Sequence, residues 1–250
     1  MGKKVLIAGE SWMTTSTHVK GVDEFTVHSY VEGVGPLKDA LISRGHEVVH
    51  MPAHLVPTQF PGSAEALAAY DVIVLSDIGA NSIQLAPSVF DRFQAGDDRL
   101  VALRDWVHGG GALMMIGGYL SFSGFQARAA FRQTALADVL PVTMLAEDDR
   151  VETPGGMVPV VVDGTHPIVS ASGTEWPALL GYNRVIAKEG VAVPATINGD
   201  PLVAAASYGK GRSAVFTSDC SPHWAPPEFC EQWPGYTDLF DGLISWLSQK

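Results

Sequence analysis

The chain has 250 residues, a length typical of one large domain or two small ones. Its formal net charge of −11, from 16 Lys and Arg against 27 Asp and Glu, argues against a nucleic-acid partner, because a phosphate backbone would repel the chain. Its two cysteines, Cys220 and Cys230, are too few for a disulfide scaffold or a four-cysteine zinc site. No apolar run approaches the roughly 20 residues that span a bilayer, so we expect a cytoplasmic protein without a membrane partner.

Strand and helix signals alternate in the first half of the chain. Four short apolar runs predict buried strands, at residues 4–8, 46–51, 71–76 and 112–116. Leucine and alanine at helical spacing predict the intervening helices, at residues 35–45, 64–69 and 100–107. This alternation predicts an α/β fold with a doubly wound, mostly parallel sheet and right-handed crossovers.

The second half has a different pattern. Apolar or β-branched runs at 158–162, 202–206 and 213–217 predict strands, and Gly209-Lys210-Gly211 between the last two predicts a hairpin turn. Leucines at helical spacing predict a closing helix over 239–247 that packs on the sheet. We expect a single domain over residues 1–250 with a β-rich insertion at about 140–210.

The position of a ligand site follows from the predicted sheet. Doubly wound sheets bind ligands outside the carboxyl ends of their strands. The segments expected there are the loops 9–20, 77–82 and 117–123, and they are rich in glycine and polar residues.

The first of these segments combines four chemically different side chains. Glu10, Ser11, His18 and Lys20 supply a carboxylate, a hydroxyl, an imidazole and an amine within a short stretch. At a strand end they could form a binding or acid–base cluster. The alternative is an ordinary solvated loop, and the sequence does not decide between the two.

The segment after the third strand contains Asp77, Gly79 and Asn81. Glycine lets successive backbone amides point at one spot, so this turn could bind a substrate or stabilise an oxyanion. Asp77 could equally be the N-cap of the following helix.

The segment after the fourth strand is where α/β enzymes place a nucleophile on a sharp turn. Gly118 and Tyr119 occupy that turn, and neither is a ready nucleophile, while Ser121 lies beyond it. The backbone of 117–121 is a candidate oxyanion site, and Tyr119 could line a pocket.

The densest cluster of reactive residue types lies in 218–229. His223 could be a general base oriented by Glu228 or Asp219, beside Trp224 as a pocket wall. Cys220 is a nucleophile only if its thiolate is stabilised nearby, and a buried, inert thiol is the alternative.

The histidines and acids do not predict a metal centre. A candidate set can be assembled from residues far apart in the chain, namely His18, His54, Asp77, Asp219 and His223. No two of them have a compact ligand spacing such as two histidines one helical turn apart. We therefore expect neither a metal nor another cofactor.

Four strings taken together resemble the putative glutamine amidotransferase family, a branch of the class I glutamine amidotransferase-like superfamily. They stand in family order across nearly the whole chain: Gly9-Glu10-Ser11-Trp12, Ser76-Asp77-Ile78-Gly79-Ala80-Asn81, Gly117-Gly118-Tyr119-Leu120-Ser121-Phe122 and Asp219-Cys220-Ser221-Pro222-His223-Trp224. The resemblance implies a flavodoxin-like core. Class I amidotransferases place a cysteine at the turn after the fourth strand and use a late histidine–glutamate pair. Here that turn has no cysteine, and His223 and Glu228 are five residues apart instead of two.

Three hypotheses about function follow. The leading one is a protein that binds or hydrolyses a small polar metabolite, with His223 as base, Glu10 or Asp77 as the supporting carboxylate and the 117–121 backbone as the oxyanion site. The second is a non-catalytic ligand-binding or assembly module, which the absent cysteine favours. The third is a glutaminase or amidotransferase that uses Cys220. Symmetric dimers are the commonest oligomers, so a homodimer is the expected assembly.

Overall fold

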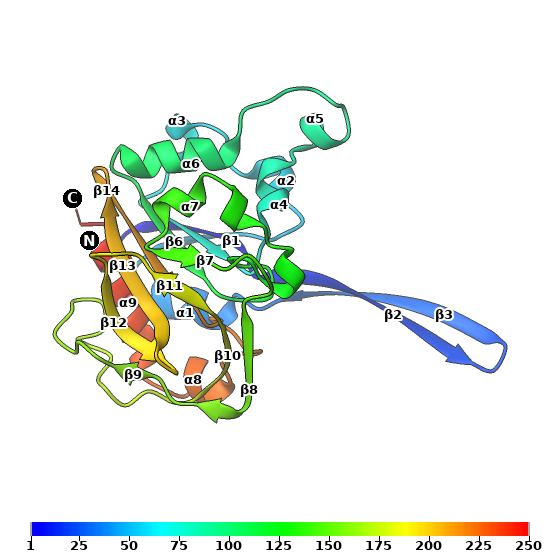
Figure 1. Ribbon diagram of the computed structural model, residues 1–250. Coiled ribbons are helices and arrows are strands. Elements are labelled where there is room, and N and C mark those ends of the chain that lie inside the picture. Colours follow the sequence, from blue (N-terminus) through cyan, green and yellow to red (C-terminus); the bar gives the residue numbers. More distant parts are fainter. Residues whose placement is uncertain (1, 250) are drawn as a thin grey trace.

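The computed structural model describes residues 2–249 and is organised around an eight-stranded sheet (Figure 1). Five strands are parallel, in the order β4 (Glu47–Met51), β1 (Lys4–Gly9), β5 (Val72–Ser76), β6 (Ala112–Ile116) and β14 (Gly211–Phe216). Antiparallel strands extend the sheet, in the order β13 (Asp200–Tyr208), β12 (Ala192–Ile197) and β9 (Val160–Val161). The parallel part has the flavodoxin-like order 2-1-3-4-5, so the expected fold class is confirmed.

Helices cover both faces of the sheet because its strands are apolar on both sides. Val5 and Ile7 contribute to one buried cluster, whereas Leu6 and Ala8 contribute to the other, as the two-residue period of a strand requires. The helices α1 (Gly35–Ser43) and α9 (Gly235–Leu247) pack on the first face, and α3 (Ala64–Leu67), α6 (Arg99–His108) and α7 (Leu136–Val139) on the second (Figure 1). The other helical segments are α2 (Val56–Gln59), α4 (Ala80–Gln84), α5 (Pro87–Phe90), α8 (Pro227–Cys230) and the 3₁₀ turns Phe125–Ala127 and Phe131–Gln133.

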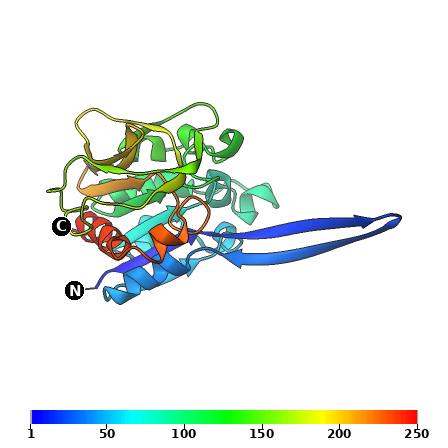
Figure 2. The ribbon, with the colours of Figure 1, turned by 90° about the horizontal axis from the view of Figure 1, so that it is seen from below.

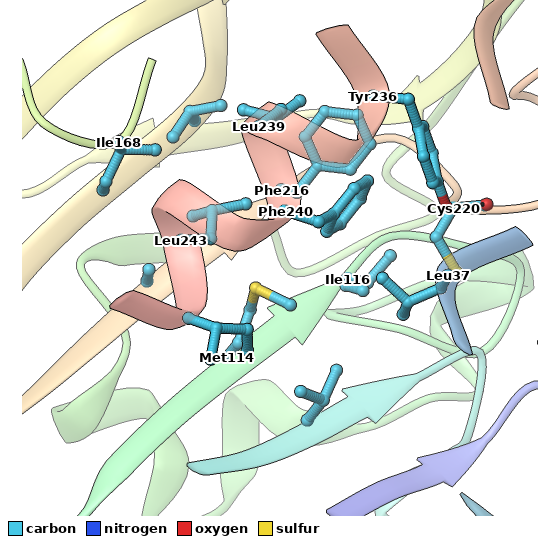
Figure 3. Packing of buried hydrophobic residues seen from close by; sticks show 14 of the residues in the cluster. Leu37, Met114, Ile116, Ile168, Phe216, Cys220, Tyr236, Leu239, Phe240 and Leu243 are labelled. Carbon is cyan, nitrogen blue, oxygen red and sulfur yellow. Dashed lines mark hydrogen bonds between the residues drawn. The ribbon is translucent and has the colours of Figure 1, made fainter. Parts of the chain in front are cut away.

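The closing helix makes the most aromatic part of the core. Tyr236, Phe240 and Leu243 of α9 lie over Phe216 of β14 and Met114 of β6 (Figure 3). The helix begins four residues before the predicted 239, at Gly235. Gly235 is required there, since a Cβ would lie 2.3 Å from the Trp233 ring.

The β-rich part of the chain contains more strands than predicted. It adds two small antiparallel sheets, β8 (Arg150–Met157) with β10 (Leu179–Asn183) and β7 (Val142–Met144) with β11 (Val185–Ala187). These strands were not predicted, and the predicted strand 158–162 is only the two-residue β9. Short strands that pair with partners far along the chain depend on tertiary context more than on local composition.

The predicted loop 9–20 is wrong. After Glu10 the chain forms β2 (Ser11–Lys20), turns at Gly21 with φ of 67°, and returns as β3 (Asp23–Glu32). We call this hairpin, residues 11–32, the arm; it projects from the body of the molecule (Figures 1 and 2). Its strands are rich in Thr, Val and aromatic residues, which favour a pleated strand. Because neither face of the arm is buried, the sequence lacks the regular alternation of apolar and polar residues by which a half-buried strand is recognised.

One negative finding concerns membranes. Within residues 2–249, no helix has both the length and the apolar character needed to cross a bilayer.

The start of α6 offers a test of the local structure. Asp98 caps this helix, because its Oδ1 accepts hydrogen bonds from the Leu100 and Val101 amides at 2.9 and 3.3 Å. We expect Asp98→Ala to lower the free energy of unfolding by about 1 kcal/mol, measured by urea denaturation. The exposed neighbour Asp97→Ala is the matched control, and equal effects of the two substitutions would contradict the capping role.

Candidate functional site

The candidate site lies where the strand order reverses. β1 has β4 on one side and β5 on the other, so the loops after β1 and β5 leave the sheet at its topological switch point. Glu10 follows β1 and Asp77 follows β5, and both have left-handed backbone, with φ of 49° and 42°. Such conformations cost about 1–3 kcal/mol each in a non-glycine residue and recur at functional sites. They turn both side chains across the end of the sheet.

A pocket of about 310 Å³ opens at this point. Its walls come from the ends of β1, β5, β6 and β14: Glu10, Trp12, Asp77, Tyr119, Asp219, Ser221, Pro222 and His223. Segments from all four family-like strings therefore meet at one edge of the sheet, as parallel strands require.

Two carboxyl groups form the floor of the pocket. Glu10 is 1% exposed, and its two oxygens accept hydrogen bonds from Ser76 Oγ at 2.5 Å and Ser221 Oγ at 2.7 Å. Asp219 is 3% exposed and accepts a hydrogen bond from the Ser221 amide at 3.3 Å. Ser221 thus lies between the two carboxyls. Gly33 leaves room for them, because a Cβ there would lie 2.7 Å from Glu10 Oε1.

Burial raises the pKa of each carboxyl in this pocket, and repulsion by neighbouring carboxylates raises the pKa of Glu10 and Asp219 further. Burial raises the pKa of Glu10, and the negative charge of Asp77 raises it further. Burial raises the pKa of Asp219 well above its usual value, and the charges of Glu10 and Asp77 add to this. Burial also raises the pKa of Asp77, against the effect of the hydrogen bond from the Leu120 amide. No lysine or arginine is among the lining residues, so the carboxyls retain protons at higher pH than exposed ones.

His223 stands at the rim, where Asp219 is its acidic neighbour. The His223 Nδ1 lies 3.9 Å from Asp219 Oδ2, and its side chain is 45% exposed. Glu228, the other predicted partner, is exposed on α8 and does not line the pocket. Asp219, and not Glu228, is the acidic partner of His223, because Asp219 follows the end of β14 at the pocket whereas Glu228 lies on the next helix.

The aromatic wall is held from behind by Glu152. Its two oxygens accept hydrogen bonds from the Tyr119 hydroxyl and from Trp224 Nε1, both at 3.0 Å. The Tyr119 ring meets the His223 ring edge to face, with centroids 4.5 Å apart. Trp224 is buried behind His223 and supports the wall instead of lining the pocket, contrary to the predicted role.

Most amides of the predicted oxyanion site, the turn after β6, are used inside the protein. The amides of Gly117, Gly118, Leu120 and Ser121 all donate hydrogen bonds inside the protein, the last three to Asn183 Oδ1, Asp77 Oδ1 and the Gly118 carbonyl. Ser121 Oγ accepts a hydrogen bond from the Asp77 amide at 3.2 Å, so it too is used structurally. Gly118 has φ of 147°, and a Cβ there would lie 2.8 Å from Asp77 Oδ1.

Gly79 and Asn81 lie outside the pocket lining, and the alternative role of Asp77 as the cap of α4 is wrong. Gly79 itself precedes α4, and Asn81 is exposed on that helix, outside the pocket lining. The Asp77 side chain accepts from Leu120 instead of capping α4. The left-handed turn at Asp77 directs its carboxylate across the sheet end toward β6.

Three members of the predicted first cluster lie away from the pocket. His18 and Lys20 are exposed far along the arm, where the His18 ring stacks on Phe25 at 4.8 Å and the Lys20 ammonium lies over the same ring. Ser11 is buried at the root of the arm and accepts a hydrogen bond from the Ala53 amide at 2.8 Å. Because β2 runs outward from Glu10, only Trp12 at its root lines the pocket.

Cys220 has the environment of an inert thiol. It is fully buried in the core below the pocket (Figure 3), with its Sγ 3.6 Å from Ser76 Oγ. Burial raises the pKa of this thiol well above its usual value, and the charges of Glu10 and Asp219 raise it further. A thiol in this state supplies little thiolate for nucleophilic attack.

One group of residues has its potential ligand atoms close together. Atoms of Glu10, Asp219 and Cys220 lie within 4.8 Å of one another. Carboxylate oxygens suit a hard divalent cation, but those of Glu10 already accept from two serines. His18 and His54 lie elsewhere, on the arm and beside Tyr30.

Sequence reasoning missed several residues that build the site. Trp12 and Ser221 line the pocket, and Gly33 and Glu152 support it from segments outside the predicted loops. The density of polar residues around 219–223 pointed to Ser221. Nothing local distinguishes Glu152 from other exposed acids, because its two partners come from other strand ends.

Comparisons with known proteins place the chain in one group. A family model described as "Putative glutamine amidotransferase" matches residues 4–249. A cytoplasmic protein from Salmonella typhimurium is 43% identical with a TM-score of 0.95, covering 98% of this chain and 99% of its own. A second, from Salmonella typhimurium LT2, is 47% identical with a TM-score of 0.94, covering 98% of this chain and 100% of its own.

More distant structures share the fold alone. A ThuA-like protein from Parabacteroides merdae is 14% identical with a TM-score of 0.56, covering 100% of this chain and 91% of its own. No curated protein matches the chain.

The raised pKa of Asp219 predicts how stability changes with pH. An acid whose pKa is higher in the folded state stabilises the fold below its unfolded pKa, and this contribution is lost as pH rises through the folded pKa. Asn cannot ionise, so we expect Asp219→Asn to gain stability relative to wild type as pH rises from 4 to 8, by about 1.4 kcal/mol for each pH unit that separates the unfolded from the folded pKa of Asp219. Urea denaturation across this range measures the difference. Asp97→Asn, at an exposed position, should give no such slope, and a flat difference for Asp219→Asn would contradict the raised pKa of Asp219.

Proposed function

The chain belongs to the Putative glutamine amidotransferase family, and we propose that its pocket hydrolyses a small polar metabolite with carboxyl groups in place of the thiolate of class I amidotransferases. The observation that carries this proposal is the pair of buried carboxyls, Glu10 and Asp219, joined through Ser221 on the pocket floor.

Two carboxyls that share a buried site do not readily ionise together. One therefore keeps its proton while the other is a carboxylate, and the pair presents a general acid and a general base side by side. In a hydrolysis, the carboxylate takes a proton from the attacking water, and the carboxylic acid gives its proton to the leaving group. The elements of water are added across the broken bond, and the pair regains its starting state when its proton redistributes.

His223 and Asp77 extend this chemistry to the rim. His223 faces Asp219 and can pass a proton between the pocket and solvent. Asp77 is held by the Leu120 amide, which fixes its orientation at the wall. His223 and Asp77 therefore keep supporting roles in the proposed hydrolysis, and Glu10 and Asp219 are its central acid–base pair.

The lining also selects the substrate class. Three carboxyls without a lysine or arginine disfavour an anionic metabolite. Trp12 and Tyr119 offer ring faces that suit an apolar edge or a cationic group of the ligand. A volume of about 310 Å³ is at the small end for ligand pockets. The pocket therefore fits a small neutral or cationic polar molecule.

The cellular setting follows from the relatives. Both Salmonella relatives are described as cytoplasmic proteins, which supports a cytoplasmic location for this chain. Small neutral or cationic metabolites are available there.

The proposal is tested with a panel of small amides, esters and glycosides, each offered in neutral, cationic and anionic forms. We expect turnover of neutral or cationic members, and a loss of at least ~100-fold in kcat/KM for Glu10→Gln and for Asp219→Asn, because each removes one half of the acid–base pair. Glu175→Gln, an exposed site, is the matched control. Full activity in either carboxyl variant would contradict the mechanism. Inactivation by a glutamine-like electrophile bound to Cys220 would support the thiol route instead.

A ligand-binding module without catalysis is the second candidate, favoured by the absence of a cysteine from the turn Gly117-Gly118-Tyr119 after β6. In that case a metabolite present at 100 times its Kd should stabilise the protein by about 2.7 kcal/mol, seen as a rise in Tm. The same metabolite should be recovered unchanged after long incubation. Its conversion to product would exclude this candidate.

A further inference from the structure

The arm is a long structure with nothing packed on it. Each of its strands has ten residues, and all of them except Ser11 are exposed. Figure 2 shows both strands extending together away from the body. A two-stranded hairpin alone is only marginally stable in water, so the arm lacks the packing that normally secures such an element.

One face of the arm is apolar. Trp12 pairs with Val31, Ser16 with Val27 and His18 with Phe25. Because side chains alternate along a strand, these residues share one face, which we call the apolar face. Between its aromatic ends it carries Val27 and the small hydroxyls of Thr14, Ser16 and Ser29. On the opposite face the large apolar side chains Met13, Tyr30 and Val19 lie toward the two ends, and the middle carries Thr15, Thr17, Thr26 and His28.

The arm also lacks the features that protect exposed strands. Residues 13–19 and 25–31 contain no Asp, Glu, Lys, Arg or Pro. The charges are confined to the tip, at Lys20, Asp23 and Glu24, and to the root, at Glu32. Exposed edge strands are usually protected by charges or proline, so an uncharged ribbon indicates a surface that is covered in use.

We propose that the arm is a dimerisation element whose apolar face lies against the body of a second copy of this chain, with the partner's arm placed reciprocally. The apolar face shares Trp12 with the pocket lining, but the proposal uses no chemistry of the pocket, so it is independent of the proposed function.

The size of the arm favours a second copy over an unrelated protein. Ten residues per strand give a length of about 34 Å and a face of roughly 350 Å². One arm docked on a foreign protein would bury roughly 700 Å² in total, less than the ~1,200 Å² of stable specific interfaces. In a two-fold dimer every contact occurs twice, so two arms reach roughly 1,400 Å².

Charge supports the same occupant. Two copies with a net charge of −11 each repel one another over most of their surfaces. The uncharged middle of the arm is a segment by which they can approach without that repulsion. An acidic or basic partner would find no complementary charge there.

The test compares oligomeric state among four full-chain proteins by sedimentation and light scattering at micromolar concentration. In the first variant Asn-Gly replaces residues 15–28 and joins Thr14 to Ser29. These two residues are a cross-strand pair, as Lys20 and Asp23 are on either side of the native two-residue turn, so the shortened hairpin keeps its register. The second is Val27→Lys, at the centre of the apolar face. The third is Thr26→Lys, which puts the same charge on the opposite face.

We expect wild type and Thr26→Lys to be dimers, and the shortened-arm and Val27→Lys proteins to be monomers with the circular dichroism of the wild type. A monomeric wild type would overturn the proposal, as would a dimeric shortened-arm protein or a Val27→Lys protein as dimeric as Thr26→Lys. Arm-dependent binding of the wild type to lipid vesicles, without dimerisation, would identify a membrane as the occupant and equally overturn it.

Discussion

The buried carboxylate of Glu10 holds the site together. Its oxygens bind Ser76 at the end of β5 and Ser221 after β14, while its backbone carbonyl accepts a hydrogen bond from Gly33 after the arm. Three separate segments are therefore tied to one residue at the switch point of the sheet. This position brings the carboxyl close to Asp77 and Asp219. Burial raises the pKa of Glu10, with a further rise from the charge of Asp77, and burial raises the pKa of Asp219, with further rises from the charges of Glu10 and Asp77. The acid–base character of the pocket is a consequence of this junction.

Such a junction lowers the stability of the fold. Left-handed backbone at Glu10 and Asp77, together with three carboxyls that repel one another, destabilises the switch point. The two buried helix–sheet layers, with α9 over Phe216 and Met114, supply the stability that tolerates this local cost. Strained backbone and buried charged groups are common at functional sites, and here both of these destabilising features lie at the pocket.

The position of Asp77 restricts the turn after β6. A side chain at position 118 would meet the Asp77 carboxylate at 2.8 Å. With this carboxylate in place, the turn after β6 accepts only glycine at position 118. A shared fold does not assign a reaction, because the chemistry depends on the residues of the site and not on the framework that holds them.

The amino-acid sequence alone determined the parallel half of the sheet, because strands buried on both faces must be continuous apolar runs such as Val72–Ser76 and Ala112–Ile116. It also indicated that Glu10, Asp77, Tyr119 and His223 would meet, since parallel strands direct their following segments to one edge. Tertiary structure decided the rest. The arm has no buried face to impose a pattern, and the partners of Glu152 come from distant strand ends. Only the folded chain shows that Asp219, and not Glu228, faces His223, because spacing in a loop does not specify direction.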